Sequence, residues 1–417
     1  MNKKFRFFST IDKKEIIAVN RVLKNKKLSS FVASKNKDFT GSSHNGGRKI
    51  LEFENKICKF FNVKYSLVVN SWTSGLVCIV GSLQLEPGDE IILPTWTMSA
   101  CASAILHWNC IPVFVDIDKD NFCLDIKDVK KKISKKTKAI MAVDIFGQSA
   151  NYSELNKISK KYNLKIISDT AQAIGSKYKG KFSGTVSDIG GFSLNHHKHI
   201  QTGEGGIIVT NNKNLYEKCK LIRNHAEVTI GNVKSKKKFL LSNMIGENYR
   251  MGEIEAAIGI EQLKKLKKII KNRQSVAKKI ISGLRGLKGL KIPSTEINNT
   301  NSYYVLPLVM DNKIIKTKRD EIVKSLNELG LKCFFGGYVN LHRLPTFEHK
   351  IAYGKNGLPW NLTQNGKNIR YKNGSLPIAE YLHDNSFIGL EICMYEFNNK
   401  EISELIKIFK KVWDKVV

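Results

Sequence analysis

The hydrophobic pattern of the chain changes period repeatedly from about residue 48 onward. Short apolar runs, typical of buried strands, cover 65–70, 90–94, 111–117, 138–146, 164–169, 190–194 and 206–210. Segments with apolar residues three or four positions apart separate several of these runs and predict helices over 73–85, 98–108 and 152–162. Repeated strand–helix units of this kind predict an α/β fold, in which a mostly parallel sheet is covered by helices on both faces.

The last third of the chain follows a different pattern. A long helix is predicted over 253–272, with its apolar face formed by Ala256, Ile260, Leu263, Leu266 and Ile270. Beyond 289–293 the pattern indicates a strand over 303–310, a helix over 319–329 and a final amphipathic helix. Because 417 residues exceed one compact core, we predict a large domain over 1–290, which includes an N-terminal extension, and a smaller α+β domain over 291–417.

The formal net charge of +32 comes from 69 Lys and Arg residues against 37 Asp and Glu residues. Such an excess suits nucleic acid, an anionic membrane surface or acidic small substrates. The lysines are scattered, they are not interleaved with aromatic residues, and the sequence has no zinc-finger or helix-turn-helix pattern. We therefore predict that the chain binds no nucleic acid. The charge is then either a compositional bias of the surface or an adaptation to acidic substrates.

The cysteines and the apolar runs bear on the location of the protein. The eight cysteines form no CxxC pair, and most lie in apolar runs, as is typical of small core residues in a reducing compartment. The first residues contain no apolar leader segment, and no apolar run reaches 18 residues. We expect a cytoplasmic protein with no membrane partner.

Lys198 is the residue that points most directly to chemistry. It lies in FSLNHHKHIQTGEGG (192–206), between a strand-like run and a glycine-rich turn, which are unusual surroundings for a solvated charge. A lysine whose pKa is low enough to free its amine can form a Schiff base with an aldehyde cofactor. Most lysines are simply solvated, so this interpretation depends on the residues that accompany Lys198.

Several accompanying residues follow predicted strands, whose carboxyl ends are where ligands bind in open α/β sheets. NSWTSG (70–75) joins a strand to a helix, so its amides and hydroxyl groups suit a phosphate, with an ordinary N-cap as the alternative. Asp169 suits a pyridinium nitrogen or a helix N-cap, and Gln172 suits a phenolic oxygen. Trp96 is either a ring-stacking residue or a core tryptophan. Together with Lys198 they describe a pocket for pyridoxal 5′-phosphate.

Longer segments carry a specific resemblance. NSWTSGL, PGDEIILPTWT, ISDTAQAIGSKYKGKFSG, FSLNHHKHIQTGEGG and NYRMGEIEAAIGIEQL occur in the order and spacing of one family, and LHRLP (341–345) and LPIAE (376–380) follow near the C-terminus. They resemble the DegT-like sugar aminotransferases, which are fold-type I pyridoxal-phosphate enzymes. The resemblance covers nearly the whole chain. It implies a fold-type I large domain with a mostly parallel sheet and a smaller C-terminal α+β domain.

The resemblance also implies roles for residues around the cofactor. Lys198 corresponds to the Schiff-base lysine, Asp169 to the partner of the pyridinium nitrogen, and Gln172 to the partner of the ring hydroxyl group. Trp96 corresponds to the aromatic residue that stacks on the ring. The family's phosphate ligands correspond to Thr73, Ser74 and Ser193.

Three further residues are implied to contact a partner subunit or the substrate. Asn248 corresponds to an asparagine that reaches the phosphate of the neighbouring subunit, which implies a homodimer with shared active sites. His342 corresponds to a histidine near the sugar, with a surface loop histidine as the alternative. Arg250 is a candidate for contact with the diphosphate of a nucleotide-linked sugar.

The chain also departs from the family pattern. Trp72 stands where the family usually has glycine, which predicts a more crowded phosphate loop, and Asp144 stands where a histidine is common. The segment 353–371 and the N-terminal segment that contains LSSFVASKNKDFTGSSHNGG are longer than usual. These departures bear on the substrate rather than on the cofactor.

The histidines around Lys198 raise two other hypotheses. His196, His197 and His199 suggest a metal, but neighbouring positions do not converge easily on one tetrahedral ion, so we predict no metal. One branch of the family has histidine in place of the lysine and is a dehydratase. Counting back from TGEGG places Lys198 itself at the lysine position, which favours transamination.

The sequence thus predicts an aminotransferase that moves an amino group from L-glutamate or L-glutamine to a keto sugar. The resemblance implies a nucleotide-linked sugar used for surface glycans such as lipopolysaccharide. One alternative is a keto sugar without a nucleotide, such as an eight-carbon acidic sugar. An alternative of another class is a regulatory nucleic-acid-binding protein on the same scaffold, and the presence of Lys198, Asp169 and Gln172 argues against it.

Overall fold

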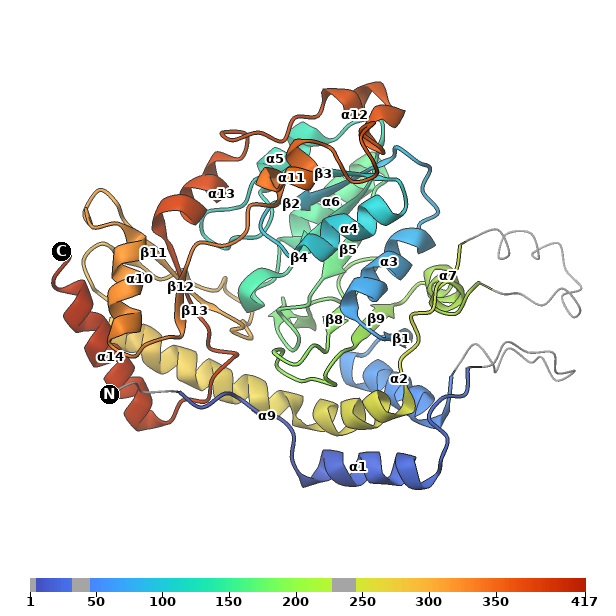
Figure 1. Ribbon diagram of the computed structural model, residues 1–417, viewed down its shortest axis with the longest axis horizontal. Helices are drawn as coiled ribbons and strands as arrows, with labels where there is room; N and C mark the ends of the chain where they lie inside the picture. The colour runs from blue at the N-terminus through green and yellow to red at the C-terminus, as the bar shows by residue number, and fades with distance from the viewer. Residues whose placement is uncertain (1–4, 32–45, 227–244) are drawn as a thin grey trace, which may run out of the picture.

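The computed structural model describes residues 5–31, 46–226 and 245–417 (Figure 1). Its largest element is a seven-stranded sheet in the order β1-β9-β8-β5-β4-β2-β3. The strands are β1 Tyr65–Val69, β2 Glu90–Pro94, β3 Ile111–Val115, β4 Thr137–Val143, β5 Lys165–Asp169, β8 Ile189–Ser193 and β9 Gly206–Thr210. Strand β9 runs opposite to the other strands of this sheet, so its pairs with β1 and β8 are antiparallel and the remaining pairs are parallel. The predicted α/β class with a mostly parallel sheet is confirmed.

Both faces of the sheet are buried, which explains why its strands are continuous apolar runs. In β1, Leu67 packs in one hydrophobic cluster and Val68 packs in another, because successive side chains of a strand point to opposite faces. The helices that cover the sheet are α2 Arg48–Phe61, α3 Trp72–Ser82, α4 Ser99–His107, α5 Ile126–Lys132, α6 Tyr152–Tyr162 and α7 Lys213–Arg223. Helix α3 contacts α4 and α7, whereas α2 packs on the long helix α9, Glu253–Leu284.

A second, antiparallel sheet lies beside the first. Its order is β10-β11-β13-β12, with β10 Leu290–Lys291, β11 Leu306–Met310, β12 Phe334–Gly336 and β13 Phe387–Leu390. Helices α10 Arg319–Glu328 and α14 Asn399–Trp413 pack on this sheet. Helix α9 runs along both sheets (Figure 1): Ile260 belongs to a core cluster of the first and Ile280 to that of the second. The helix extends beyond the predicted 253–272 because its apolar stripe continues through Ala277, Ile280 and Leu284.

Part of the chain beyond the predicted boundary at residue 290 packs on the large sheet. Residues 341–381 contain short helices: η4 Leu341–Arg343, α11 Pro345–Glu348, η5 Trp360–Leu362, α12 Gln364–Asn368 and α13 Pro377–Tyr381. Leu341, Phe347 and Trp360 join the core cluster of the large sheet, so this part of the C-terminal region packs on the first domain. The segment 353–371 noted as long in the sequence therefore covers the edge strand β3, where Tyr371 donates a hydrogen bond to the Pro112 carbonyl.

The remaining elements are short or lie near the N-terminus. Helix α1, Lys13–Lys24, packs on α9 and begins at a capping box formed by Asp12 and Glu15. A two-stranded ribbon is formed by β6 Lys177–Tyr178 and β7 Lys181–Phe182. Two other short helices are η2 Ile145–Gly147 and η6 Leu382–Ser386, the latter a π-helix. Within 5–31, 46–226 and 245–417, no helix combines the length and apolarity needed to cross a membrane.

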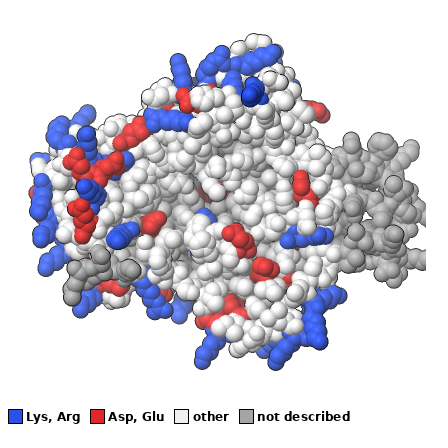
Figure 2. All heavy atoms as spheres, in the orientation of Figure 1, with Lys and Arg blue, Asp and Glu red and all other residues white. Residues whose placement is uncertain are grey.

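On the face shown in Figure 2, Lys and Arg side chains lie mainly around the periphery. The middle of this face is mostly white, with several separate Asp and Glu side chains. This face presents no continuous basic stripe of the kind that follows a nucleic-acid backbone.

Candidate active site

A cavity of about 320 Å³ lies where several strands of the large sheet end. Its lining includes Ser71 after β1, Asp169 at the end of β5 and Ser193 at the end of β8. Gln172 and Lys198 also line it, so residues separated by more than 120 positions in the sequence face one space. The carboxyl end of a parallel sheet is the expected place for a ligand in this class of fold.

One end of the cavity is formed by the first turn of α3. Ser71 is the N-cap: its hydroxyl group accepts a hydrogen bond from the Ser74 amide at 3.1 Å and pairs with the Ser74 hydroxyl group at 2.8 Å. Thr73 is exposed and lines the cavity. The first amides of a helix have no partner inside the helix and attract anions. This end therefore suits a phosphate, and Ser193 lines the same space.

Asp169 is held by three donors. The Trp72 indole nitrogen lies 2.7 Å from Oδ1, the Ala171 amide 3.0 Å from Oδ1, and the Cys101 thiol 2.8 Å from Oδ2. Burial raises the pKa of the Cys101 thiol well above its usual value, and the charge of Asp169 raises it further, so this thiol is a neutral donor. These three contacts fix the direction of the carboxylate at the cavity, where it can face a cationic nitrogen.

Gln172 lies between this cavity and a neighbouring one. Its Oε1 accepts a hydrogen bond from the Phe146 amide at 2.8 Å, and its Nε2 donates to the Tyr338 hydroxyl group at 3.0 Å. The neighbouring cavity, of about 360 Å³, is lined by Gln172, His197, Tyr304, Phe335, Tyr338 and Glu391, among others. Because Gln172 and His197 line both cavities, a molecule in the second would lie next to one in the first.

Lys198 is only 8% exposed. Its Nζ lies 4.4 Å from the centre of the Tyr304 ring, and no carboxylate pairs with it among the described residues. Burial lowers the pKa of Lys198 to about 8, while nearby Cys393 and Asp169 act in the opposite direction. An amine with this pKa is partly neutral near physiological pH, as a nucleophile or proton carrier requires.

This pKa predicts a pH-dependent reactivity at Lys198. An aldehyde reagent with a borohydride reductant should label Lys198 half-maximally near pH 8, with labelling increasing as pH rises because the neutral amine is the reactive form. At pH 8 an ordinary lysine, with pKa about 10.4, should react roughly a hundredfold less per residue. Peptide mapping after labelling at several pH values measures this difference. A midpoint near pH 10 at Lys198 would contradict the expected environment.

The histidines next to Lys198 have other contacts. His199 is fully buried, its Nε2 lies 2.9 Å from the Ser302 carbonyl, and burial lowers its pKa to about 3. Burial also lowers the pKa of His197 to about 4, so both rings are neutral at pH 7. In the parts of the chain that the structure describes, no group of three or more His, Cys, Asp or Glu side chains could hold a metal ion.

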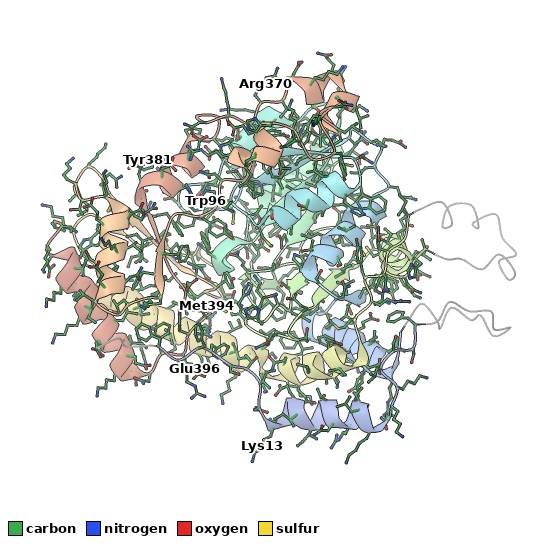
Figure 3. All side chains as sticks on the ribbon, in the orientation of Figure 1. Lys13, Trp96, Arg370, Tyr381, Met394 and Glu396 are labelled. Carbon is green, nitrogen blue, oxygen red and sulfur yellow. The ribbon has the colours of Figure 1, made fainter. Side chains whose placement is uncertain are left out.

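Trp96 is not where the sequence placed it. The side chain is 0% exposed and lies inside the molecule (Figure 3). Phe122 stacks on it at 6.0 Å, and Phe146, Tyr338 and Phe387 surround it, while its indole nitrogen donates to Asn340. Its neighbours Thr97 and Met98 line the cavity instead. The predicted stacking role is therefore corrected: Trp96 belongs to the aromatic core, because it has no face open to the cavity.

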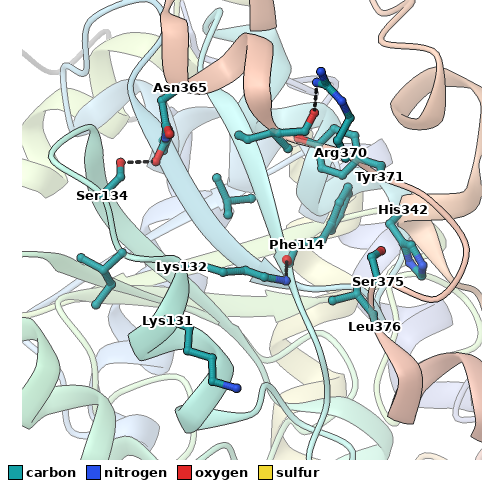
Figure 4. A pocket seen from close by; sticks show the side chains of 14 residues that line it. Phe114, Lys131, Lys132, Ser134, His342, Asn365, Arg370, Tyr371, Ser375 and Leu376 are labelled. Carbon is teal, nitrogen blue, oxygen red and sulfur yellow. Dashed lines mark hydrogen bonds between the residues drawn. The ribbon is translucent and has the colours of Figure 1, made fainter.

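His342 also lies away from the cavity of Lys198. It is buried, with Nδ1 2.7 Å from the Thr95 hydroxyl group and Nε2 2.9 Å from a Glu380 oxygen. It borders a separate cavity of about 380 Å³ along β3, together with Lys132, Arg370 and Tyr371 (Figure 4). Burial lowers its pKa, although Glu380 acts in the opposite direction. His342 is therefore not an exposed loop histidine, and it does not line the cavity of Lys198.

Asn248 and Arg250 likewise do not line the cavity of their own chain. They follow the segment 227–244, which lies outside the described residues, and they contact each other: Arg250 Nε donates to Asn248 Oδ1 at 2.8 Å. Asn248 is exposed. A single chain therefore leaves Asn248 open to solvent, where a partner subunit could meet it.

Two residues at the site were not assigned a function from the sequence. Trp72 was noted only as a bulky residue in place of glycine, and Cys101 only as a small core residue. Both contact Asp169. The tryptophan in place of glycine is a signal in the sequence, whereas nothing in the pattern around Cys101 distinguishes it from a core residue.

Comparisons with known proteins place the chain in a family. The model of the DegT/DnrJ/EryC1/StrS aminotransferase family matches residues 23–387. The chain is 33% identical to GDP-perosamine synthase of Vibrio cholerae over 73% of this chain and 80% of that protein. It is 31% identical to the UDP-4-amino-4,6-dideoxy-N-acetyl-beta-L-altrosamine transaminase of Campylobacter jejuni, over 91% of this chain and 96% of that protein.

Solved structures show the same fold over the full length. Helicobacter pylori PseC, described as an aminotransferase involved in the biosynthesis of pseudoaminic acid, superposes with a TM-score of 0.81 at 26% identity, covering 99% of this chain and 100% of that one. A GDP-4-keto-6-deoxymannose-3-dehydratase with a trapped PLP–glutamate species superposes with a TM-score of 0.76 at 25% identity, over 97% of this chain and 99% of that one. The fold is thus shared by transaminases and a dehydratase.

The residues present fit pyridoxal 5′-phosphate, the cofactor of this family. The helix N-terminus at Ser71–Ser74 suits its phosphate, the carboxylate of Asp169 suits its ring nitrogen, and Lys198 is a buried amine with a lowered pKa beside the same cavity. Since the family model spans most of its length and this cavity suits the family's cofactor, the chain belongs to the DegT/DnrJ/EryC1/StrS family of pyridoxal 5′-phosphate-dependent sugar aminotransferases.

Proposed function

We propose that this protein transfers an amino group from L-glutamate or L-glutamine to the ketone of a nucleotide-linked sugar, in the synthesis of a surface glycan. The observation that carries the proposal is the buried Lys198, with its lowered pKa, beside Asp169 in a cavity that ends at a helix N-terminus. The names of two relatives, one a GDP-sugar enzyme and one a UDP-sugar enzyme, support a nucleotide-linked substrate.

When bound, the cofactor supplies an aldehyde that a lysine can capture and a ring that withdraws electrons. The chain's own residues do the rest. Lys198 Nζ would form the covalent link to the cofactor and would carry a proton to and from the reacting carbon, which requires an amine with a lowered pKa. Asp169 holds the proton on the ring nitrogen with its negative charge. Thr73, Ser74 and Ser193 would hold the phosphate, and Gln172 would orient the ring hydroxyl group.

The neighbouring cavity is our proposed site for the sugar. It opens beside Gln172 and His197 and offers the aromatic surfaces of Tyr304, Phe335 and Tyr338. Aromatic side chains give a sugar ring a flat apolar surface, while the Tyr338 hydroxyl group and the Glu391 carboxylate offer polar contacts. His342 is separated from this cavity by its place beside β3, so we assign it a structural link between Thr95 and Glu380.

We also propose that two subunits form each complete site. Asn248 is exposed and does not line the cavity of its own chain, as expected for a residue that reaches the phosphate in a partner. Arg250, bonded to Asn248, would then lie near the partner's substrate rather than its own. A twofold homodimer is the simplest assembly in which both subunits exchange such residues.

The test is an amination screen with purified protein and a panel of 4-keto and 3-keto sugars, both with and without a linked nucleotide. With L-glutamate or L-glutamine as the donor, mass spectrometry should detect conversion of at least one nucleotide-linked ketone to the amine. The subunit number is measured on the same preparation by sedimentation. Amination restricted to an eight-carbon acidic keto sugar would favour the alternative substrate. A protein that binds the cofactor but aminates nothing in the panel would contradict the proposed function.

A further inference from the structure

The Trp72 side chain fills a space that exists because two adjacent residues, Gly75 and Gly191, have no side chains. Trp72 is the first residue of α3 and is only 6% exposed. A Cβ atom at Gly75 would lie 2.8 Å from Cε3 of the indole, so any larger residue there would displace the ring. Gly191 on β8 lies on another side of the ring, where an added Cβ would be 2.5 Å from Cζ3. The indole therefore has a fixed position next to Asp169.

This position makes the surroundings of the Asp169 carboxylate asymmetric. Oδ1 accepts two hydrogen bonds from rigid groups, the Trp72 indole at 2.7 Å and the Ala171 amide at 3.0 Å. The described residues give Oδ2 one donor, the Cys101 thiol. A thiol is a weak donor that turns about a single bond, and Cys101 Sγ also lies 3.0 Å from the Thr97 hydroxyl group. The S–H bond can therefore rotate from Oδ2 toward Thr97, whereas the indole N–H keeps its direction toward Oδ1.

We propose that Trp72 is a positioning residue, which ties Oδ1 of Asp169 so that Oδ2 faces the ring nitrogen of the cofactor. The inference rests on the role given to Asp169 in the proposed function. The tryptophan that stands in place of the family's usual glycine would then serve to hold the Asp169 carboxylate. Trp72 acts through Asp169, by fixing the direction of the carboxylate.

The test compares Trp72→Phe, which removes the N–H donor and keeps an aromatic ring, with Cys101→Ala, which removes the thiol. Each full-length protein is freed of cofactor and titrated with pyridoxal 5′-phosphate by absorbance. We expect Trp72→Phe to weaken binding about tenfold or more, because a hydrogen bond to a charged group contributes roughly that factor or more. Cys101→Ala should change the affinity by less than about threefold, since a thiol is a weak donor and its S–H bond can turn to Thr97 instead.

A second measurement separates positioning from mere packing. The pH midpoint of the visible absorbance change of the loaded enzyme should move upward in Trp72→Phe. A misdirected carboxylate holds the ring proton less well, and losing a nearby positive charge raises a pKa. Trp72→His should restore the wild-type midpoint as long as the imidazole is neutral, that is, at pH values above the pKa of its ring. The reason is that the imidazole Nε2–H superposes on the indole N–H. A packing role alone would lower the melting temperature of the cofactor-free protein without moving this midpoint.

The outcomes are distinct. Wild-type affinity and midpoint in Trp72→Phe, or an equal loss in Cys101→Ala, would overturn the inference. If Trp72→Phe does not fold, Trp72→His carries the test, and a tenfold loss of affinity in that variant would overturn it. Asp169→Ala distinguishes failure of the proposed function from failure of this inference. Tight cofactor binding in Asp169→Ala would remove the role of Asp169 in the proposed function. Weak binding in Asp169→Ala together with normal binding in Trp72→Phe would reject only the role of Trp72.

Discussion

In Lys198→Ala, the visible absorbance of the bound cofactor should disappear and the amination rate should fall by at least about 10³-fold, since a positioned general acid–base group contributes roughly 10²–10⁴-fold and covalent capture is lost as well. The physical reason is that the other groups lining the cavity cannot replace an amine with a pKa of about 8. Absorbance spectra and turnover with the substrate found in the screen measure both effects.

Lys179 offers a matched control for this experiment. Its Nζ also lies over a tyrosine ring, 5.4 Å from the centre of Tyr178, but the side chain is exposed and bonds to Ser153. Lys179→Ala should keep the spectrum and the rate of the wild type within about twofold, as expected for a surface substitution. If Lys198→Ala retained the absorbance and more than a tenth of the activity, Lys198 would not be the reactive lysine.

The second large effect is expected in Asp169→Asn, which keeps the shape of the side chain and removes its charge. The rate of the half-reaction with L-glutamate should fall roughly 10²–10³-fold, the usual cost of removing one preorganised electrostatic group. The affinity for L-glutamate should change much less, because the carboxylate acts on the ring nitrogen and not on the donor. Single-turnover kinetics over a range of glutamate concentrations separate the two quantities.

Asp116 provides the corresponding control. This buried carboxylate also follows a strand of the large sheet, but it accepts hydrogen bonds from the amides of Ile378 and Ala379 at the start of α13. Asp116→Asn should lower the melting temperature and leave the rate of the half-reaction within about threefold of the wild type. Equal losses of rate in the two variants would mean that Asp169 supports the fold and has no special role at the ring nitrogen.

The positions of the strands were readable from the sequence because each is buried on both faces. The runs at 90–94 and 206–210 match β2 and β9 at both ends, and helix α6 matches the predicted 152–162. Local hydrophobicity is sufficient there, since a buried strand must be apolar along its whole length. The candidate site was also largely predictable: Asp169, Gln172, Ser193 and Lys198 follow strands and meet because parallel strands end at one edge.

The sequence alone thus determined the fold class, the family and the group of residues around Lys198, because these depend on local patterns and on segments in a fixed order. Only the tertiary structure decided that Trp96 is enclosed by Phe122 and Phe387, that residues 341–381 return to the first sheet, and that Trp72 and Cys101 hold Asp169. These depend on contacts between residues distant in the sequence, and such contacts leave no local periodicity. A tryptophan in an apolar segment packs equally well in a core or on a ligand, and only the side chains brought around it by the fold determine which of the two occurs.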